Sequence, residues 1–361
     1  YDIVMHVDAD VSREIRKKVA TGRGAKPRAG LSGFSVSNLH IPYFIRPWEK
    51  DLPKPHHVPS PLHIMIEAPV KAASFNNEYG RPQIVGYFRT FENETYGYNT
   101  PICINGGIGL IERKQIRKKT LVPGTPLIVL GGTAISLGFS SNPEIHRRCQ
   151  ETIDSCFQLG KDNPILSLQD VGAGGLSIAV SKLVHQSKLG AHINLSTMAI
   201  WCNEAEELYV LAIEESKLDT FKTIAEREYC PYAMIGQVQE KAVITVEDTH
   251  FNNNPINVPS SLLFEHRSEN IREAKLPAGT NTQVSFDTNP YDFKEAAERV
   301  LTLPCVASKQ FLITIADRSV GGLVARDQLV GRWQVPVADV GVIADNCKSH
   351  TGSAMAMGER P

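Results

Sequence analysis

The sequence lacks a net charge of either sign, and it has few cysteines in any recognisable pattern. Its 38 basic and 39 acidic residues give a formal charge of −1, which excludes a polybasic nucleic-acid binder or an acidic tail on global charge alone. Its seven cysteines are dispersed, without CxxC pairs or metal-finger spacing, so neither a disulfide framework nor a zinc finger is indicated. Reduced thiols fit the cytoplasm or, alternatively, an organelle matrix.

Several other signatures are missing. No apolar run approaches the roughly 18 residues of a membrane span, and the first residues lack a signal-peptide pattern, so no membrane partner is expected. The sequence contains no Walker loop, no G-x-S-x-G and no HExxH, which leaves serine-hydrolase and metallohydrolase interpretations without support. What is present is 361 residues with 42% hydrophobic character, enough for a full core and more than one domain.

The first two thirds of the chain contain two different patterns. From Leu31 to Tyr87, short apolar runs such as His63 to Glu67 alternate with Gly, Pro and Asn, which predicts strands joined by structured loops. Farther on, Asn142-Pro143-Glu144 predicts the start of a helix, and Gly160 its end. Strands predicted at Pro164 to Leu168 and at Leu208 to Ile213 then alternate with helices, which indicates an α+β unit.

The composition changes again in the last third. From His250 to Asn289 it is rich in Asn, Pro, Ser and Thr, which predicts an extended connection between domains. Beyond it we predict a helix at Phe293 to Leu301 and strands at Phe311 to Ile315 and Val335 to Ile343. The chain opens at Tyr1 without an initiator Met, and the last module is expected to be incomplete, so we expect a longer parent polypeptide.

Two segments of the first half could carry chemistry. Arg13 to Arg28 has seven basic residues in sixteen, interleaved with glycine; it could bind phosphate, or it could be a solvated basic loop. Asp170 leaves a predicted strand into the glycine-rich run Val171 to Gly175. Such a carboxylate suits Mg²⁺, and it could equally cap the next helix.

Two further clusters are acidic or mixed. The acids of Trp201 to Glu207 could simply be solvated at a strand edge. The second cluster has cations and carboxylates that suit a Mg-nucleotide, although ordinary salt bridges explain it as well. It consists of Lys309, Asp317, Arg318, Asp327 and Asp339.

Taken in order, longer segments resemble the synthetase core of the large phosphoribosylformylglycinamidine synthase. The resemblance covers most of the chain and is specific because long segments agree in the same order. These segments are ATGRGAKPRAG (20–30), FSVSNLHIP (34–42), FNNEYGRPQIVGYFRTF (75–91), INGGIG (104–109), RRCQETIDSC (147–156), DNPILSLQDVGAGGLS (162–177), IWCNEAEELYVLA (200–212) and the long run from 303 to 342.

The resemblance implies a fold of α/β and α+β subdomains of the AIR-synthetase-like (PurM-like) ATPase type, repeated with pseudo-twofold symmetry, in which the sheet of one α/β subdomain joins that of its partner. It divides the chain into an α/β subdomain at 1–125, an α+β subdomain at 126–250, a linker at 251–290, and the incomplete start of a second α/β subdomain at 291–361. The last part would carry an auxiliary nucleotide site.

The resemblance also implies a reaction: the ATP-dependent amidation of formylglycinamide ribonucleotide with glutamine-derived ammonia, in purine biosynthesis. Mg²⁺ and ATP or ADP are the implied cofactors. In the auxiliary site Lys309 would contact phosphate, with Ala338 beside it, and Asp339 would bind Mg²⁺. No glutaminase sequence is present, so the implied partners are a glutaminase domain or the rest of the parent chain.

The departures from the family fall where its chemistry takes place. A catalytic His segment has no counterpart after Val7, and Lys17 stands where the family has a metal-binding Asp. Gln169 replaces a His, and Ala205-Glu206 replace a Ser-Gln pair of the substrate loop. No catalytic residue is intact. Arg16, Asp170, Glu204 and Glu206 remain as remnants of a substrate and metal site, with Asp170 a weak metal ligand.

Three functions stay open on the sequence. The chain could be a degenerate, catalytically silent copy or fragment of the enzyme, because Lys17, Gln169 and Glu206 are true substitutions. It could instead belong to an intact amidoligase that acts on formylglycinamide ribonucleotide and whose mobile loops and flanking domains lie outside this sequence. A third possibility is a scaffold subunit of a larger assembly, with an exposed basic loop that contacts RNA or an acidic protein.

Overall fold

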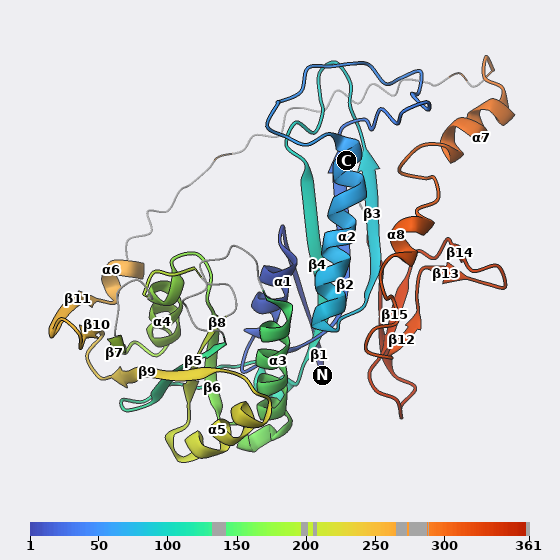
Figure 1. The fold of residues 1–361 in the computed structure, drawn as a ribbon. Coiled ribbons are helices and arrows are strands. Elements are labelled where there is room, and N and C mark those ends of the chain that lie inside the picture. Colours follow the sequence, from blue (N-terminus) through green and yellow to red (C-terminus); the bar gives the residue numbers. More distant parts are fainter. Residues whose placement is uncertain are drawn as a thin grey trace.

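The computed structural model describes residues 1–131, 142–195, 201–204, 208–264, 273, 287 and 289–358. The first part of the chain forms a four-stranded sheet in the order β1-β4-β2-β3, in which only the β2–β3 pair is parallel. Two helices, α1 and α2, belong to this layer (Figure 1). The elements are β1 (Asp2–Asp8), α1 (Val11–Val19), β2 (Lys26–Val36), α2 (Pro61–Tyr79), β3 (Gln83–Thr90) and β4 (Ile102–Ile111).

Helix α2 corrects the sequence prediction, which placed only strands and loops between Leu31 and Tyr87. Ser60 caps the helix by accepting from the His63 amide at 3.2 Å, and Gly80 ends it with φ 86°, both ordinary helix boundary signals. Ile64, Ala68, Ala72 and Phe75 pack on the core at helical spacing. The sequence analysis did not recognise this helical spacing, because it interpreted the short apolar run at His63 to Glu67 as part of a strand.

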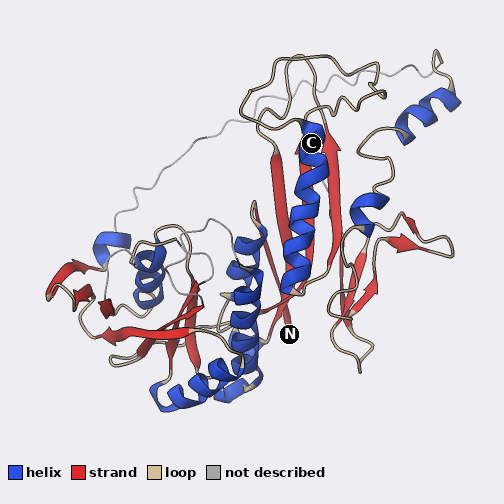
Figure 2. Ribbon diagram, viewed as in Figure 1, coloured by secondary structure: helices blue, strands red, loops and turns tan. Residues whose placement is uncertain are grey.

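The second part forms a seven-stranded sheet in the order β11-β10-β7-β9-β5-β8-β6. Successive strand residues face two different cores: Ile128 and Leu130 pack with α3 and α5, whereas Leu127 and Val129 pack with α4. Figure 2 shows this sheet with its helices beside the first layer. The elements are β5 (Pro126–Gly131), α3 (Pro143–Gln158), β6 (Ile165–Asp170), α4 (Gly175–His185), β7 (Gly190–Leu195), β8 (Leu208–Ile213), α5 (Leu218–Arg227), β9 (Tyr232–Gln239), β10 (Val243–Asp248), β11 (Asn253–Pro259) and α6 (Ser261–Phe264).

The predicted strand–loop–helix order is confirmed in this sheet, and β8 has the predicted bounds. Asn142 caps α3 by accepting from the amides of Glu144 and Ile145. One difference concerns the expected extended connection after His250. Seven of its residues form β11, which pairs antiparallel with β10, so the second sheet reaches Pro259. Most of the remaining connection lies outside the described residues.

The last part is a smaller module, with α7 (Phe293–Leu301), α8 (Gln310–Thr314) and short strands: β12 (Val324–Arg326), β13 (Leu329–Val330), β14 (Val335–Pro336), β15 (Gly341–Ala344) and β16 (Gly352–Met355). Strands β12, β15 and β16 form one sheet, which lies beside β3 (Figure 1). Its Ile343 and Met355 pack against Leu31, Ile84 and Ile108 of the first sheet. The two modules therefore share a hydrophobic core.

Helix α7 agrees with the prediction, but two predicted strands are wrong. The segment Phe311 to Ile315 is strand-like in composition, yet most of it lies in α8. The helix places Leu312, Ile313 and Ala316 on one face, where they line a pocket together with α2 and β3. The predicted strand at Val335 to Ile343 is broken into β14 and β15. Within the described residues, no helix is both long and apolar enough to cross a membrane.

Candidate functional site

A pocket of about 460 Å³ lies where α1 meets the loop that follows β6. We call it the first-site pocket. It gathers residues from β1, α1, β6, the glycine-rich loop and α4, and it brings together Arg16, Lys17 and Asp170, which the sequence analysis had singled out. Its charged and polar lining consists of His6, Arg13, Arg16, Lys17, Gln169, Asp170 and Lys182.

Helix α1 presents its cations to this pocket because they recur three to four residues apart. Asp10 caps the helix by accepting from the Arg13 amide at 3.1 Å, which fixes where its first turn begins. The Arg16 side chain is buried, with Nη1 3.5 Å from Ser12 Oγ. Its guanidinium is therefore held in one place at the pocket wall.

Lys17 is partly exposed, and its Nζ donates to Asp8 Oδ2 at 2.6 Å. Burial by itself disfavours the charged form of Asp8. Hydrogen bonds from Lys17 and from the Asp10 amide, together with the Lys17 charge, outweigh burial, so the pKa of Asp8 is lowered. At this position, where the resemblance implies a metal-binding acid in the family, the chain thus has an ammonium group with its own counter-ion.

Asp170 is the last residue of β6, and it does not cap the next helix. The N-cap of α4 is Gly174, at φ 84°, without a side-chain cap. Asp170 Oδ1 instead accepts from Gln169 Nε2 at 2.8 Å. The capping alternative is therefore wrong, and Asp170 stands at the pocket with one carboxylate oxygen already engaged.

Glu204 does not line the pocket itself, but it contacts the glycine-rich loop that does. Its Oε1 accepts from the Gly174 amide at 2.9 Å. A Cβ at Gly175 would lie 2.5 Å from Asn203 O, so glycine lets the Glu204 segment pack directly on this loop. Glu206 lies outside the described residues. The roles assigned to these acids stay predictions.

The basic segment Arg13 to Arg28 is not the solvated loop considered above. Arg16, Lys18, Arg23 and Arg28 are all buried. Arg23 donates to two backbone oxygens, Ile165 O at 2.6 Å and Asn163 O at 2.8 Å. Arg13, Lys17 and Lys26 are exposed, but they lie on α1 and β2 rather than on a loop.

Two residues of that segment, Glu14 and Lys18, belong to a buried ion cluster. Glu14 accepts from Lys18 through Oε1 and from Arg81 Nη1 through Oε2, the latter at 2.6 Å. Burial, reinforced by the positive charge of Arg81 and opposed by Glu14, lowers the pKa of Lys18 to about 7. We call these three side chains the Glu14 cluster.

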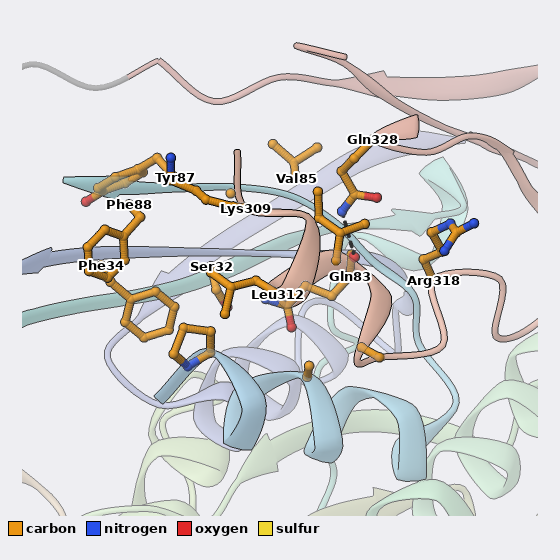
Figure 3. A pocket seen from close by; sticks show the side chains of 15 residues that line it. Ser32, Phe34, Gln83, Val85, Tyr87, Phe88, Lys309, Leu312, Arg318 and Gln328 are labelled. Carbon is orange, nitrogen blue, oxygen red and sulfur yellow. Dashed lines mark hydrogen bonds between the residues drawn. The ribbon is translucent and has the colours of Figure 1, made fainter. Parts of the chain in front are cut away.

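A second pocket, of about 150 Å³, lies between α2, β3 and α8, and we call it the junction pocket. Figure 3 shows Tyr87 and Phe88 on one side of the view and Arg318 on the other. Lys309 lines the pocket half-buried, with Nζ donating to Ala307 O at 2.7 Å, and burial lowers its pKa. Arg318 Nε donates to Asp327 Oδ2 at 2.6 Å, so the salt-bridge interpretation holds for that pair.

The other residues of the predicted auxiliary site lie at different distances from this pocket. Gln328 lines the junction pocket. The Ala338 amide donates to Gln328 O at 3.2 Å, so Ala338 contacts a lining residue without lining the pocket itself. Asp339 is exposed. The sequence analysis placed the predicted auxiliary site in the second half alone, whereas the junction pocket is also lined by Phe34 and Tyr87 of the first half. The segments that contain these two residues were both among those that carried the resemblance.

Comparison with known families finds two domains. Residues 123–249 match the AIR synthase related protein C-terminal domain, and residues 308–361 match the FGAR-AT PurM_N-like domain.

Solved structures from Thermotoga maritima share the fold. PurLQS is 17% identical with a TM-score of 0.63, over 98% of this chain and 55% of that one. PurL complexed with ADP is 18% identical with a TM-score of 0.63, over 95% and 53%. PurL complexed with FGAR is 17% identical with a TM-score of 0.56, over 76% and 48%. The chain thus spans about half the length of these proteins. The PurM-like α/β fold and the resemblance to a PurL-like synthetase core are confirmed.

Proposed function

We propose that this chain is part of a synthetase core related to formylglycinamide ribonucleotide amidotransferase, that it binds an adenine nucleotide at the junction pocket, and that its first site is catalytically silent. The observation that carries the silent first site is Lys17, which lines the same pocket as Asp170 and donates to Asp8 at 2.6 Å. An ammonium group in the pocket repels a divalent metal there.

The nucleotide proposal rests on the junction pocket. Lys309 supplies a positive charge for phosphate, and Phe34, Tyr87 and Leu312 supply apolar and aromatic surface of the kind on which a base packs. Solved structures of T. maritima PurL are complexed with ADP, AMPPCP and ATP. Because the pocket is smaller than the roughly 300 Å³ of common ligand sites, it would hold one end of the nucleotide, with the remainder outside.

Mg²⁺ at this second site would be held by Asp339, which does not line the pocket itself but follows Ala338, whose amide donates to the lining residue Gln328. The donor chemistry fits, since an exposed carboxylate can supply one oxygen ligand while phosphates and waters supply the others. When bound, the metal would neutralise phosphate charge. Asp327 is engaged with Arg318 and contributes no ligand in this arrangement.

The first site does not fit Mg²⁺ in the same way. Within the described parts of the chain, no group of three or more His, Cys, Asp or Glu side chains could hold a metal. Among the described residues, Asp170 is the one carboxylate that lines the pocket, whereas Mg²⁺ prefers an octahedral oxygen shell. We therefore derive no catalytic step through a metal there.

An activity assay tests the proposal against the alternative of an intact amidoligase. The full-length protein that contains this chain is incubated with formylglycinamide ribonucleotide, ATP, Mg²⁺ and ammonium, which bypasses the need for a glutaminase partner. We expect no formylglycinamidine ribonucleotide above a no-protein control. Product formation that depends on the protein would refute the silent first site and favour the purine-biosynthetic enzyme.

A further inference from the structure

Two buried cysteines that are far apart in the sequence meet in the hydrophobic core beside α3 and α5, which lie side by side (Figure 1). Cys149 belongs to α3, and Cys230 lies in the turn between α5 and β9. Their sulfur atoms are 3.7 Å apart, in contact but farther apart than the roughly 2.0 Å of a disulfide bond. Both cysteines are thiols in this structure.

The turn after α5 places Cys230 against α3. Tyr229 has φ 51°, in the left-handed region that often ends a helix, and its carbonyl accepts from Arg148 Nη1 of α3 at 2.8 Å. The Cys230 amide donates to Ala225 O of α5 at 2.9 Å. The turn is therefore tied to both helices, and the fold itself holds the two sulfur atoms next to each other.

The surroundings of Cys230 favour its thiolate. Hydrogen bonds, above all one from Cys149, together with the positive charge of Arg148 outweigh the effect of burial, so the pKa of Cys230 is lowered. The thiolate is the form of cysteine that attacks oxidants. Cys156, farther along α3, is a contrast, because burial raises the pKa of its thiol to about 12.

Burial limits the kind of oxidant that suits this pair. Cys149 is fully buried, and Cys230 is only 4% exposed. A bulky oxidant such as glutathione disulfide does not fit against so little sulfur surface, whereas hydrogen peroxide is small and uncharged. The chemical class that fits is therefore a hydroperoxide.

We propose that Cys149 and Cys230 form a site of reversible oxidation, at which hydrogen peroxide converts the two thiols into a disulfide between α3 and the turn after α5. This inference is independent of the proposed function. It assigns chemistry to two residues that line neither candidate pocket.

The oxidation takes place in two steps. The Cys230 thiolate attacks one peroxide oxygen, so that an S–O bond forms, the O–O bond breaks and hydroxide leaves. The Cys149 sulfur then attacks the sulfur of the resulting sulfenic acid, so that the S–S bond forms, the S–O bond breaks and a second hydroxide leaves. The two thiol protons convert both hydroxides into water, and two electrons pass from the sulfur atoms to the peroxide.

Peptide mapping of the full-length protein after treatment with hydrogen peroxide tests the proposal. The remaining thiols are blocked with N-ethylmaleimide in urea, and the protein is digested with trypsin without reduction. Cleavage after Arg148 and Arg227 gives the peptides 149–161 and 228–241. We expect these two peptides to be joined, two hydrogens lighter than their sum, and to separate on treatment with dithiothreitol.

Variants assign the bond, because Cys156 shares a peptide with Cys149. Cys149→Ala and Cys230→Ala should each abolish the joined peptides, whereas Cys156→Ala, at a buried cysteine of the same helix, is the matched control and should retain them. Oxidation should raise the melting temperature of wild type and of Cys156→Ala only, because the bond closes a loop of about 80 residues in the unfolded chain. Fragment masses of the wild-type peptides locate the bonded sulfur directly, so the test stands even where a variant does not fold.

Three results would overturn the inference. The first is that both thiols of the pair stay open to N-ethylmaleimide after peroxide has oxidised the exposed Cys202, Cys305 and Cys347. The second is a bond from Cys230 to Cys156, or Cys230 recovered only as its sulfinic acid. The third is an equal yield of the joined peptides when peroxide is added to the protein already unfolded in urea, since the fold would then play no part in bringing the sulfur atoms together.

Discussion

The Glu14 cluster should make the stability of the first layer depend on pH in a direction opposite to that of an ordinary surface lysine. Lys18 is fully buried beside both Glu14 and Arg81, so the cluster carries one excess positive charge when Lys18 is protonated. Deprotonation leaves a neutral pair of Glu14 and Arg81. This is why burial and Arg81 lower the pKa of Lys18 from 10.5 to about 7.

The sign follows from proton linkage. Between about pH 7 and the ordinary lysine pKa, the unfolded chain binds a proton that the folded chain has lost. The free energy of unfolding therefore rises with pH in that window, with a slope that approaches about 1.4 kcal/mol per pH unit. The contribution is complete above the unfolded pKa and is lost as the pH falls through 7.

Urea unfolding at pH 7.5 and 8.5, followed by circular dichroism, measures this slope. We expect wild type to gain about 1 kcal/mol over that unit, and Lys18→Met to lose the gain while staying near wild-type stability. Glu14→Gln should cost about 3–5 kcal/mol, because it leaves Arg81 and Lys18 buried without their anion. Lys222→Met controls for removing a lysine. Equal slopes in wild type and Lys18→Met would refute the assigned cluster chemistry.

Two other predictions concern the junction pocket and the glycine-rich loop. The full-length protein should release ADP or ATP on denaturation, and the Lys309→Ala variant should release less. The variant should also melt at a lower temperature, since a ligand at a hundredfold excess over its Kd stabilises the folded protein by about 2.7 kcal/mol. Equal release from both proteins would exclude a role for Lys309. Gly175→Ala should destabilise by more than Gly124→Ala in thermal unfolding, because both have positive φ but only Gly175 would place a Cβ 2.5 Å from a backbone oxygen. Equal losses of stability would show that the backbone strain at positive φ dominates, and not the close approach of the new Cβ to the backbone oxygen.

The sequence predicted best where local chemistry decides the structure. The strand and loop around Asp170 follow from an apolar run that ends in glycines, and α3 follows from its Asn-Pro-Glu start. It failed at α8, where composition favours a strand but packing against α2 and β3 favours a helix. It also failed at Arg23, whose backbone partners Asn163 and Ile165 are distant in sequence. It failed at Lys18 as well, because the burial of its pair with Glu14 depends on Arg81, which is distant in sequence.

A chain of polar contacts connects α1 with the junction pocket through the first layer. Arg81 Nη1 donates to Glu14 on α1, and Arg81 Nε donates to Asn76 Oδ1 at 2.8 Å. Asn76 Nδ2 donates to Gln83 Oε1 at 2.9 Å, and Gln83 O accepts from Gln328 Nε2 at 3.3 Å in the junction pocket.

Because α1 also carries the cations of the first-site pocket, any change to Arg81 or Glu14 disturbs the supports of both pockets at once. A loss of nucleotide binding in such a variant would therefore report on packing, and it would assign no role to the junction pocket. Lys17 and Lys309 line separate pockets and lie outside this chain of contacts. For that reason they are the positions at which a change in binding can be attributed to one site alone.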